Sequence, residues 1–275
     1  MKIEFIKMHG CGNDFMIIDN RSGQCLLNKK QIINLAHRKT GVGFDQLILL
    51  DLSEQASIAM QIFNADGSKA GMCGNALRCI AGIIMDDIGE DEVLIELTSG
   101  IVKARAALND EIAVDLGIAL FNTAIIPIKS HLDPLSIDFD IPGLPKAVAL
   151  SVGNPHLVFF LDKNHSFELE SLGPILENHE FFPDRINVSL AIIVDSENIV
   201  LNVWERGAGR TLACGSAACA TAAAAVMRGL CLPNKEIAVQ MTGGTLKIKV
   251  SDDYQLTMTG PYKMVYKGII DLEDA

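Results

Sequence analysis

Two stretches of this chain, 141 residues apart, follow the same pattern. Residues 63–85 read FNADGSKAGMCGNALRCIAGIIM, and residues 204–226 read WERGAGRTLACGSAACATAAAAV. Each stretch runs from the end of an apolar strand through a glycine-containing loop to Cys-Gly, and then into an apolar helical run. The pattern therefore places Cys73 and Cys214 at equivalent positions, and it predicts a chain built from two similar halves.

The repeat extends well beyond the cysteines. At the same offset of 141, the Gly-Asn dipeptide at Asn13 recurs at Asn154, and other polar positions recur with it. The remaining pairs are Gln46 with Asn187, Asn64 with Glu205, and Lys69 with Arg210. Later the offset grows by three residues, so that Gly100 and Lys103 match Gly244 and Lys247. We interpret the chain as two homologous halves.

Charge, length and cysteine usage exclude several classes of protein. The 275 residues carry a net charge of −11 without a block of Lys or Arg, which argues against nucleic acid as a partner. The N-terminal MKIEFIKMHG lacks the apolar core of a signal peptide, and no run is long enough to cross a membrane. Seven cysteines without a C-x-x-C pair predict free thiols in the cytoplasm and no metal site.

The strand and helix patterns predict an α+β fold. Short apolar or β-branched runs recur about every ten residues between turn residues, which is typical of sheets that close on themselves. Residues 76–85 and 217–227 are helical runs with almost no polar face, so they must be buried on all sides. We therefore expect two pseudo-symmetric domains, each a mixed β-sheet rolled into a barrel around a central α-helix. Residues 28–40 and 171–179 are expected to cover the outside.

A cysteine at a helix start is suited to acid–base chemistry. The unpaired backbone N–H groups and the helix dipole favour a thiolate, and the same groups can bind a carboxylate. If Cys73 and Cys214 face each other, they can hold an α-amino acid with one thiolate and one thiol on opposite faces of its Cα. One removes the α-proton and the other returns a proton, and no cofactor is required. The remaining cysteines are expected to be small core residues: Cys11, Cys25, Cys79, Cys219 and Cys231.

One difference between the halves suggests an asymmetric ligand. Glu205-Arg206 stands where the first half has Asn64-Ala65. Arg206 could bind a carboxylate through two points and Glu205 an ammonium group, although the pair could also form an internal salt bridge. His156 could tune a thiol, or simply be packed in its strand.

These motifs together resemble the diaminopimelate epimerase family. The resemblance covers essentially the whole length through KMHGCGNDF, GFDQL, FNADGS, MCGN, GNPH, RINV, ERGAGRTLACGS and GPYKMVYKG. It implies a cofactor-independent interconversion of LL- and meso-diaminopimelate in the route to lysine and peptidoglycan. It implies that Cys73 and Cys214 are the catalytic pair and that His156 and Glu205 modulate their pKa. The positions implied to bind substrate are Asn13, Gln46, Asn64, Gly74, Asn75, Asn154, Asn187, Glu205, Arg206, Gly215 and Ser216.

The resemblance also implies a domain division and an assembly. The first domain is expected to cover residues 1–117, joined by a C-terminal strand at about 263–275, and the second residues 118–262. A homodimer is implied, with Tyr266 at its interface. The chain departs from the usual family pattern at Ala76 and Ala217, where glycine is common, and at Lys69 and Arg210, where acidic residues are expected. If these cations point toward the helix starts they favour thiolates; otherwise they lie in solvent.

Two other functions remain open from the sequence. A proline racemase of the same fold would use the same two-thiol chemistry, but Asn75 stands where that family usually has histidine, and a proline substrate has no use for Glu205-Arg206. A non-catalytic amino-acid-binding or thiol-sensing protein would retain the fold without turnover, and Cys73 and Cys214 would then form a disulfide on oxidation. Proton exchange at the α-carbon separates these functions.

Overall fold

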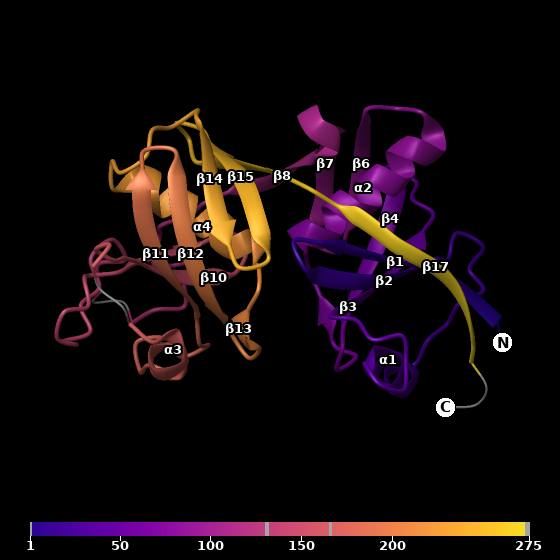
Figure 1. The fold of residues 1–275 in the computed structure, drawn as a ribbon, viewed down its shortest axis with the longest axis horizontal. Helices are drawn as coiled ribbons and strands as arrows, with labels where there is room; N and C mark the ends of the chain where they lie inside the picture. The colour runs from indigo at the N-terminus through magenta and orange to yellow at the C-terminus, as the bar shows by residue number, and fades with distance from the viewer. Residues whose placement is uncertain (1, 130–131, 165–166, 273–275) are drawn as a thin grey trace. The chain divides into compact units, whose positions relative to one another are not determined.

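The computed structural model describes residues 2–129, 132–164 and 167–272. The chain divides into two compact units, the first made of Met1–Val114 and Thr259–Ala275 and the second of Asp115–Met258. The two boundaries lie within strands β8 (Ile112–Ile118) and β16 (Gln255–Gly260). Each unit combines a mixed sheet with few helices, which is an α+β architecture (Figure 1).

The first unit is a mixed sheet around one long helix. Its ladder runs β17–β1–β2–β3–β4, with β2 and β3 parallel, and continues through a parallel β4–β6 pair to β7 and β8. Helix α2 packs against β1, β6 and β7. The elements are β1 (Lys2–Gly10), β2 (Asn13–Asp19), α1 (Lys29–Ala36), β3 (Gln46–Asp51), β4 (Ile58–Asn64), β5 (Lys69–Ala70), α2 (Gly74–Ile88), β6 (Glu92–Leu97), β7 (Gly100–Ala106), a 3-10 turn (Leu108–Asp110) and β17 (Lys263–Asp271).

The second unit repeats this arrangement. Its ladder runs β9–β10–β11–β12, with β10 and β11 parallel, and continues through a parallel β12–β14 pair to β15. The elements are β9 (Val148–Ser151), β10 (Pro155–Phe160), α3 (Leu169–Glu177), β11 (Asn187–Asp195), β12 (Asn198–Glu205), β13 (Gly209–Thr211), α4 (Gly215–Met227), β14 (Glu236–Met241), β15 (Gly244–Val250) and β16.

The pairing of β2 with β3 and of β10 with β11 preserves the sequence repeat. Phe15 pairs with Gln46 in the first unit, and His156, 141 residues later, pairs with Asn187. Past the central helices the equivalence changes to 144 residues, as the glycine and lysine positions predict: Glu92 pairs with Arg105, and Glu236 with Lys249. The two halves therefore share one topology, with three extra residues inserted between the helix and the following hairpin.

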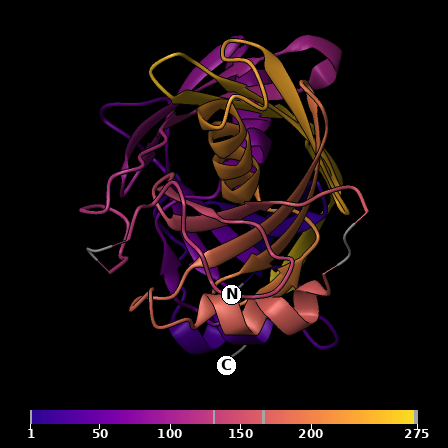
Figure 2. The same cartoon turned by 90° about the vertical axis from the view of Figure 1, so that its left-hand side faces the viewer.

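Both central helices are buried because their sequences offer almost no polar surface. Ten residues of α4 are buried, most of them alanines, and the helix packs against β9, β10, β11, β12, β14 and β15. Figure 2 shows α4 inside the strands of the second unit. Alanine lets strand backbones approach the helix from every side. Helix α2 ends at Ile88, and its C-cap Gly89 has a left-handed φ of 72° that glycine adopts at little cost.

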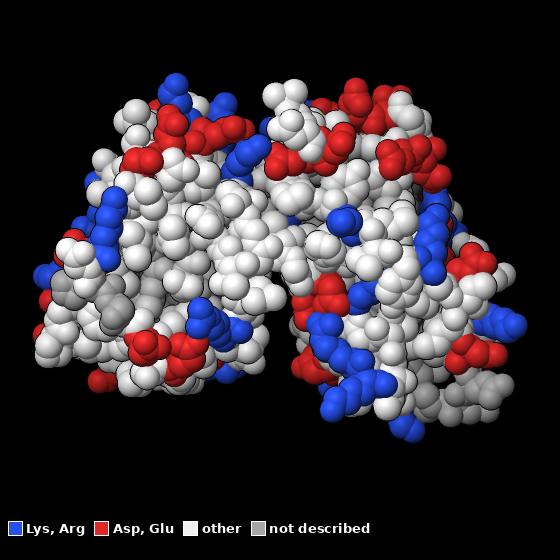
Figure 3. Space-filling view, viewed as in Figure 1, with Lys and Arg blue, Asp and Glu red and all other residues white. Residues whose placement is uncertain are grey.

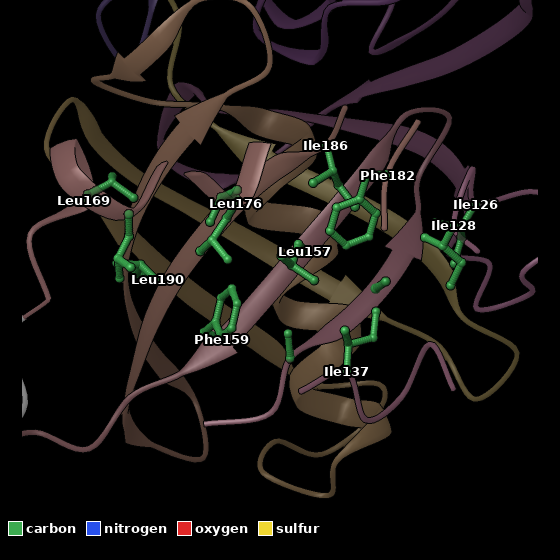
Figure 4. Close-up of a cluster of buried hydrophobic side chains, with 14 residues drawn as sticks. Ile126, Ile128, Ile137, Leu157, Phe159, Leu169, Leu176, Phe182, Ile186 and Leu190 are labelled. Carbon is green, nitrogen blue, oxygen red and sulfur yellow. The ribbon is translucent and has the colours of Figure 1, made fainter. Parts of the chain in front are cut away.

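Shorter helices cover the outside of each sheet. Helix α1 spans only Lys29–Ala36, shorter than the expected 28–40, and a capping box between Asn28 and Gln31 defines its start. Helix α3 covers the second unit, where its leucines belong to one buried cluster with Leu157, Phe159 and Leu190 (Figure 4). The segment before β9 showed no periodicity, yet Ile126, Ile128 and Ile137 belong to this same core.

The chain returns to the first unit at its C-terminus. Strand β17 pairs antiparallel with β1 from Asp271 to Lys263. Just before it, Tyr262 lies against Gly82 of α2, so closely that a methyl group at Gly82 would come within 2.3 Å of the ring. Residues 273–275 of the expected C-terminal strand lie outside the described residues.

No helix in the described ranges is long and apolar enough to cross a membrane. Lysine and arginine side chains are dispersed among acidic and uncharged ones on the face seen in Figure 3.

Candidate active site

Cys73 and Cys214 hold the same backbone position, at the N-cap of α2 and α4. Their backbones are extended, with φ and ψ of −147° and 107° at Cys73 and −134° and 114° at Cys214. Each carbonyl accepts the first helical hydrogen bond, from Leu77 and Ala218. The following N–H groups have no partner within the helix, so each helix start is a site of positive potential suited to an anion.

Asn13 and Asn75 flank Cys73 in the first unit. Asn13 Oδ1 lies 3.6 Å from Cys73 Sγ and accepts a hydrogen bond of 3.3 Å from Asn75 Nδ2. Asn13 Nδ2 donates to the Asp45 carboxylate at 2.9 Å. On the other side, Asn75 Oδ1 accepts from Arg78 at 2.9 Å. The two amides therefore form a polar chain from a carboxylate to a guanidinium, and the Cys73 thiol donates to the Asn13 oxygen within it.

Two further predicted substrate positions lie on adjacent strands of the same unit. Gln46 at the start of β3 and Asn64 at the end of β4 are directly paired, and Gln46 Nε2 donates to Asn64 Oδ1 at 3.0 Å. Ser68 accepts from Asn64 Nδ2 at 3.0 Å. The buried Oε1 of Gln46 has no protein partner within the described residues, so it remains open to a donor from a ligand.

In the second unit, Cys214 contacts Ser216 and Glu205. Cys214 Sγ lies 3.4 Å from Ser216 Oγ, and Asn154 Nδ2 donates to the same hydroxyl at 3.4 Å. The Glu205 carboxylate and the backbone N–H of Ala217 also act on this thiol, and they shift its pKa in opposite directions.

At Cys214 the structure corrects the expectation that the helix start lowers the pKa of the thiol. The pKa of Cys214 is raised well above 9.0 by burial and next by the Glu205 charge; Ser216 and the Ala217 N–H oppose this. Without a ligand, burial outweighs the helix start, and Cys214 keeps its proton. The core cysteines also have raised pKa values: burial raises the pKa of Cys79 to about 12 and that of Cys231 to about 11.

His156 lies beyond Asn154, which separates it from Ser216 and Cys214. It is fully buried, and its Nε2 bonds Asn154 Oδ1 at 3.0 Å. Because an amide oxygen only accepts, Nε2 carries the proton. Burial, and then the charge of Arg206, lower the pKa of His156 to about 3, so the ring is neutral near pH 7. It reaches Cys214 only through Asn154 and Ser216.

The loop after β12 holds the charged pair that breaks the symmetry. Asn187 Oδ1 accepts the backbone N–H of Arg206 at 2.9 Å, and the Arg206 guanidinium donates to the Asp184 carbonyl at 3.0 Å. The buried carboxylate of Glu177 fixes the loop by accepting from Trp204 Nε1 at 2.7 Å and from the Gly207 N–H at 2.8 Å. Arg206 is exposed and Glu205 is half-buried. Among the described ion pairs, none joins Glu205 to Arg206.

Lys69 and Arg210 are both exposed and bind groups other than the thiols. Lys69 Nζ donates to Gln61 at 3.2 Å and lies 5.5 Å from the centre of the Phe63 ring, while Arg210 pairs with Glu170. Their side chains are therefore held on the protein surface.

Sequence reasoning missed three residues that hold the candidate site. Asp45 stands next to Gln46 in the GFDQL motif, and Arg78 is the one charged residue of an otherwise apolar run. A charged residue at a position that must be buried is a signal for a structural partner. Glu177 carried no such signal, because it lies on a helix with a polar side.

Comparison with known proteins identifies the family. A family model described as "Diaminopimelate epimerase" matches residues 5–121 and 148–265. A diaminopimelate epimerase from Rhodospirillum centenum is 40% identical over 96% of this chain and 91% of its own length. One from Erythrobacter litoralis is 41% identical over 100% of this chain and 99% of its own length.

Solved structures with much lower identity share the fold. A phenazine biosynthesis protein of the PhzF family from Bacillus anthracis matches with a TM-score of 0.69 at 16% identity, over 99% of this chain and 100% of that protein. A hydroxyproline epimerase from Agrobacterium vitis matches with a TM-score of 0.69 at 14% identity, over 99% and 93%. These two show the fold alone. The family model and the full-length relatives carry the assignment: this chain belongs to the diaminopimelate epimerase family.

Proposed function

We propose that this chain is a diaminopimelate epimerase, an isomerase that interconverts LL- and meso-diaminopimelate in lysine and peptidoglycan precursor biosynthesis. Membership of the family supports the activity. The observation that carries the chemistry is the equivalent placement of Cys73 and Cys214, each the N-cap of a buried helix. In this proposal the two thiols act on opposite faces of the substrate Cα.

The reaction is a two-base proton transfer. In one direction a thiolate removes the α-proton, and the other thiol delivers its own proton to the opposite face, so that the centre inverts. Reversing the direction exchanges the roles. At the start of each helix, the N–H groups of Gly74 and Asn75, and of Gly215 and Ser216, can bind the carboxylate beside the reacting carbon. That carboxylate would otherwise oppose the carbanion that develops at Cα.

Cys214 needs a proton acceptor to become a base, because its pKa is raised by burial and by Glu205. Glu205 is the acidic group whose charge acts on this thiol, and in this proposal it accepts the thiol's proton. A substrate ammonium near Glu205 would offset the carboxylate's charge and thereby lower the pKa of Cys214. His156 acts indirectly, by holding Asn154 against Ser216.

The distal end of the substrate requires a second set of contacts. Diaminopimelate carries an ammonium and a carboxylate at each end. The proposed partners are Arg206 for the distal carboxylate and the amides of Asn64, Asn154 and Asn187 for the remaining polar groups. Asn13 and Gln46 complete the set. A substrate with only one zwitterionic end would leave these polar groups unpaired, which favours diaminopimelate over proline.

Homodimerisation is also proposed, through β17. This strand exposes Met264, Val265, Tyr266 and Ile269, each at least 45% accessible to solvent. The Tyr266 ring packs edge-on against Phe5, with centroids 5.9 Å apart, which holds it in place at the surface. Exposed apolar side chains of this kind are suited to a symmetric contact with a second copy. We further propose a cytoplasmic location, a small-molecule substrate without a cofactor, and no membrane or nucleic-acid partner.

Assays with reduced protein in D₂O test the proposed activity. We expect deuterium to enter the α-position of LL-diaminopimelate, with formation of the meso isomer, and not that of L-proline. Exchange of proline alone would identify the racemase alternative. Binding of diaminopimelate without exchange would identify the non-catalytic alternative.

A further inference from the structure

The two equivalent asparagines, Asn13 and Asn154, present opposite ends of their amides to the helix starts. Asn13 turns its carbonyl oxygen toward Cys73 and Asn75, and its NH₂ group donates to Asp45. Asn154 turns its NH₂ group toward Ser216, beside Cys214. The two amides are therefore equivalent in position but opposite in hydrogen-bond polarity.

Charged groups at both ends fix the orientation in the first unit. A carboxylate can only accept, so Asp45 requires the NH₂ group of Asn13 on its side. A guanidinium can only donate, so Arg78 requires the oxygen of Asn75 on its side and leaves the Asn75 NH₂ group for Asn13. The charge-assisted bond to Asp45, at 2.9 Å, is the stronger constraint on Asn13, because its bond to Asn75 is 3.3 Å long.

Asp45 is itself held in place. Its Oδ1 accepts from Arg38 at 2.7 Å, and its Oδ2 accepts the backbone N–H of Asp14 at 3.1 Å. Arg38 also pairs with Asp14, whose pKa is lowered to about 2; burial opposes this shift, and the bonds from Arg38 and Lys7 outweigh it. The Asp45 carboxylate is thus an anchored acceptor.

The equivalent positions of the second unit do not repeat this anchor. The residue equivalent to Asp45 is Ile186, which is fully buried, and the residue equivalent to Arg78 is Cys219. There the oxygen of Asn154 binds His156 instead, at the position where the first unit has Phe15. Different residues in the two halves therefore hold equivalent amides in opposite senses.

We propose that Asp45 is a positioning residue that, with Arg78, locks the carbonyl of Asn13 toward Cys73 and so keeps the proton on that thiol. A hydrogen-bond acceptor beside a thiol favours S–H, whereas a donor favours the thiolate. The lock acts on Cys73 alone, whereas burial and Glu205 hold the proton on Cys214. The role of the lock in catalysis rests on the proposed function, whereas its effect on the thiol proton does not.

Alkylation of the two thiols by iodoacetamide tests the lock, since only thiolates react at a useful rate. The rate at Cys73 and at Cys214 is measured against pH on the reduced protein, by peptide mass spectrometry. In Asp45→Asn the carboxamide also carries a donor, so Asn13 can turn its NH₂ group toward Cys73. We expect about a threefold faster reaction of Cys73 below its pKa, which is a downward pKa shift of about half a unit. The rate at Cys214 should stay unchanged.

Two comparisons separate the lock from the loss of a charge. Asp91→Asn removes an exposed carboxylate of the same unit and should leave both rates unchanged. In an Asn13→Ala background the Asp45→Asn change should no longer accelerate Cys73, because the amide through which it acts is absent. The other charged groups near Asn13, Cys73 and Cys11 do not change between these variants, so they cannot cause a difference in rate. They are Lys7, Asp14, Arg38, Arg78 and Glu111.

An equal acceleration in the Asn13→Ala background would overturn the proposal, as would no acceleration in Asp45→Asn alone. The readout needs no turnover. Failure of the wild-type protein to epimerise diaminopimelate would contradict the proposed function and leave the alkylation result intact.

Discussion

His156 donates from Nε2 to Oδ1 of Asn154 across 3.0 Å, in the interior of the second unit. The equivalent residue of the first unit is Phe15, which is equally buried. The protein thus gives up an apolar core position for a ring whose buried Nδ1 has no hydrogen-bond partner among the described residues. A group held at such a cost is expected to act on the site beside it.

His156→Phe, which copies the first unit, tests this role. The substitution removes the donor to Asn154 and frees its amide to turn away from Ser216. We expect epimerisation to fall about tenfold, the effect of one lost positioning hydrogen bond of ~1.4 kcal/mol. Thermal unfolding should show a stability equal to the wild type or higher. An unchanged kcat/KM would contradict the role.

The same residue predicts a pH dependence of stability. Burial lowers the pKa of His156 from 6.5 to about 3, so the unfolded chain binds the proton more readily than the folded one. Its contribution is therefore complete above pH 6.5 and is lost as the pH falls toward 3. Urea unfolding from pH 7 to 4 should show a shallower decline for His156→Phe than for the wild type. Parallel curves would mean that the histidine does not titrate as its burial requires.

Glu205 is expected to control the proton on Cys214. After burial, its charge is the largest cause that raises the pKa of this thiol. In Glu205→Gln, alkylation of Cys214 below its pKa should therefore accelerate by about tenfold, which corresponds to about one pKa unit, while epimerisation falls. Glu197→Gln, on an exposed turn, is the control. Slower alkylation of Cys214 in Glu205→Gln would show that the carboxylate favours the thiolate instead.

The contact between Gly82 and Tyr262 predicts the effect of one methyl group. A Cβ at Gly82 would lie 2.3 Å from the ring, so Gly82→Ala must displace Tyr262 and the segment that leads into β17. We expect a loss of about 1–3 kcal/mol in the free energy of unfolding. Gly71→Ala, where nothing lies within 4 Å of the new atom, should change stability little. Equal stabilities of the two variants would show that the segment yields freely.

The architecture could be predicted from the sequence because the repeat determines it. The Gly100 and Gly244 offset predicted the change of phase that the hairpins show. The apolar runs after Cys73 and Cys214 predicted helices buried on all sides, and both are. The short strands β5 and β13 escaped prediction, because two or three residues carry no periodicity. The irregular segment that contributes Ile126 and Ile137 escaped for the same reason.

The local chemistry could not be predicted in the same way. A helix start favours a thiolate by its dipole, but the balance at Cys214 depends on its burial and on Glu205, which are three-dimensional facts. The opposite orientations of the Asn13 and Asn154 amides depend on Asp45 and His156. Asp45 is distant from Asn13 in sequence, and the bond from His156 to Asn154 depends on the rotamers of both side chains. Sequence equivalence therefore identified the positions and not their hydrogen-bond polarity.

Exchange of the α-proton shows whether Cys73 and Cys214 are two bases that act on one carbon. Reduced wild-type protein, Cys73→Ser and Cys214→Ser are each incubated with LL-diaminopimelate in D₂O, and deuterium is measured early in the product and in the recovered substrate. We expect deuterium to enter the wild-type product well before the recovered substrate, because a separate thiol donates the second proton. Both serine variants should lose epimerisation by at least about a thousandfold. Normal turnover by either serine variant, or equally fast deuterium entry into recovered substrate and product, would contradict the two-base mechanism.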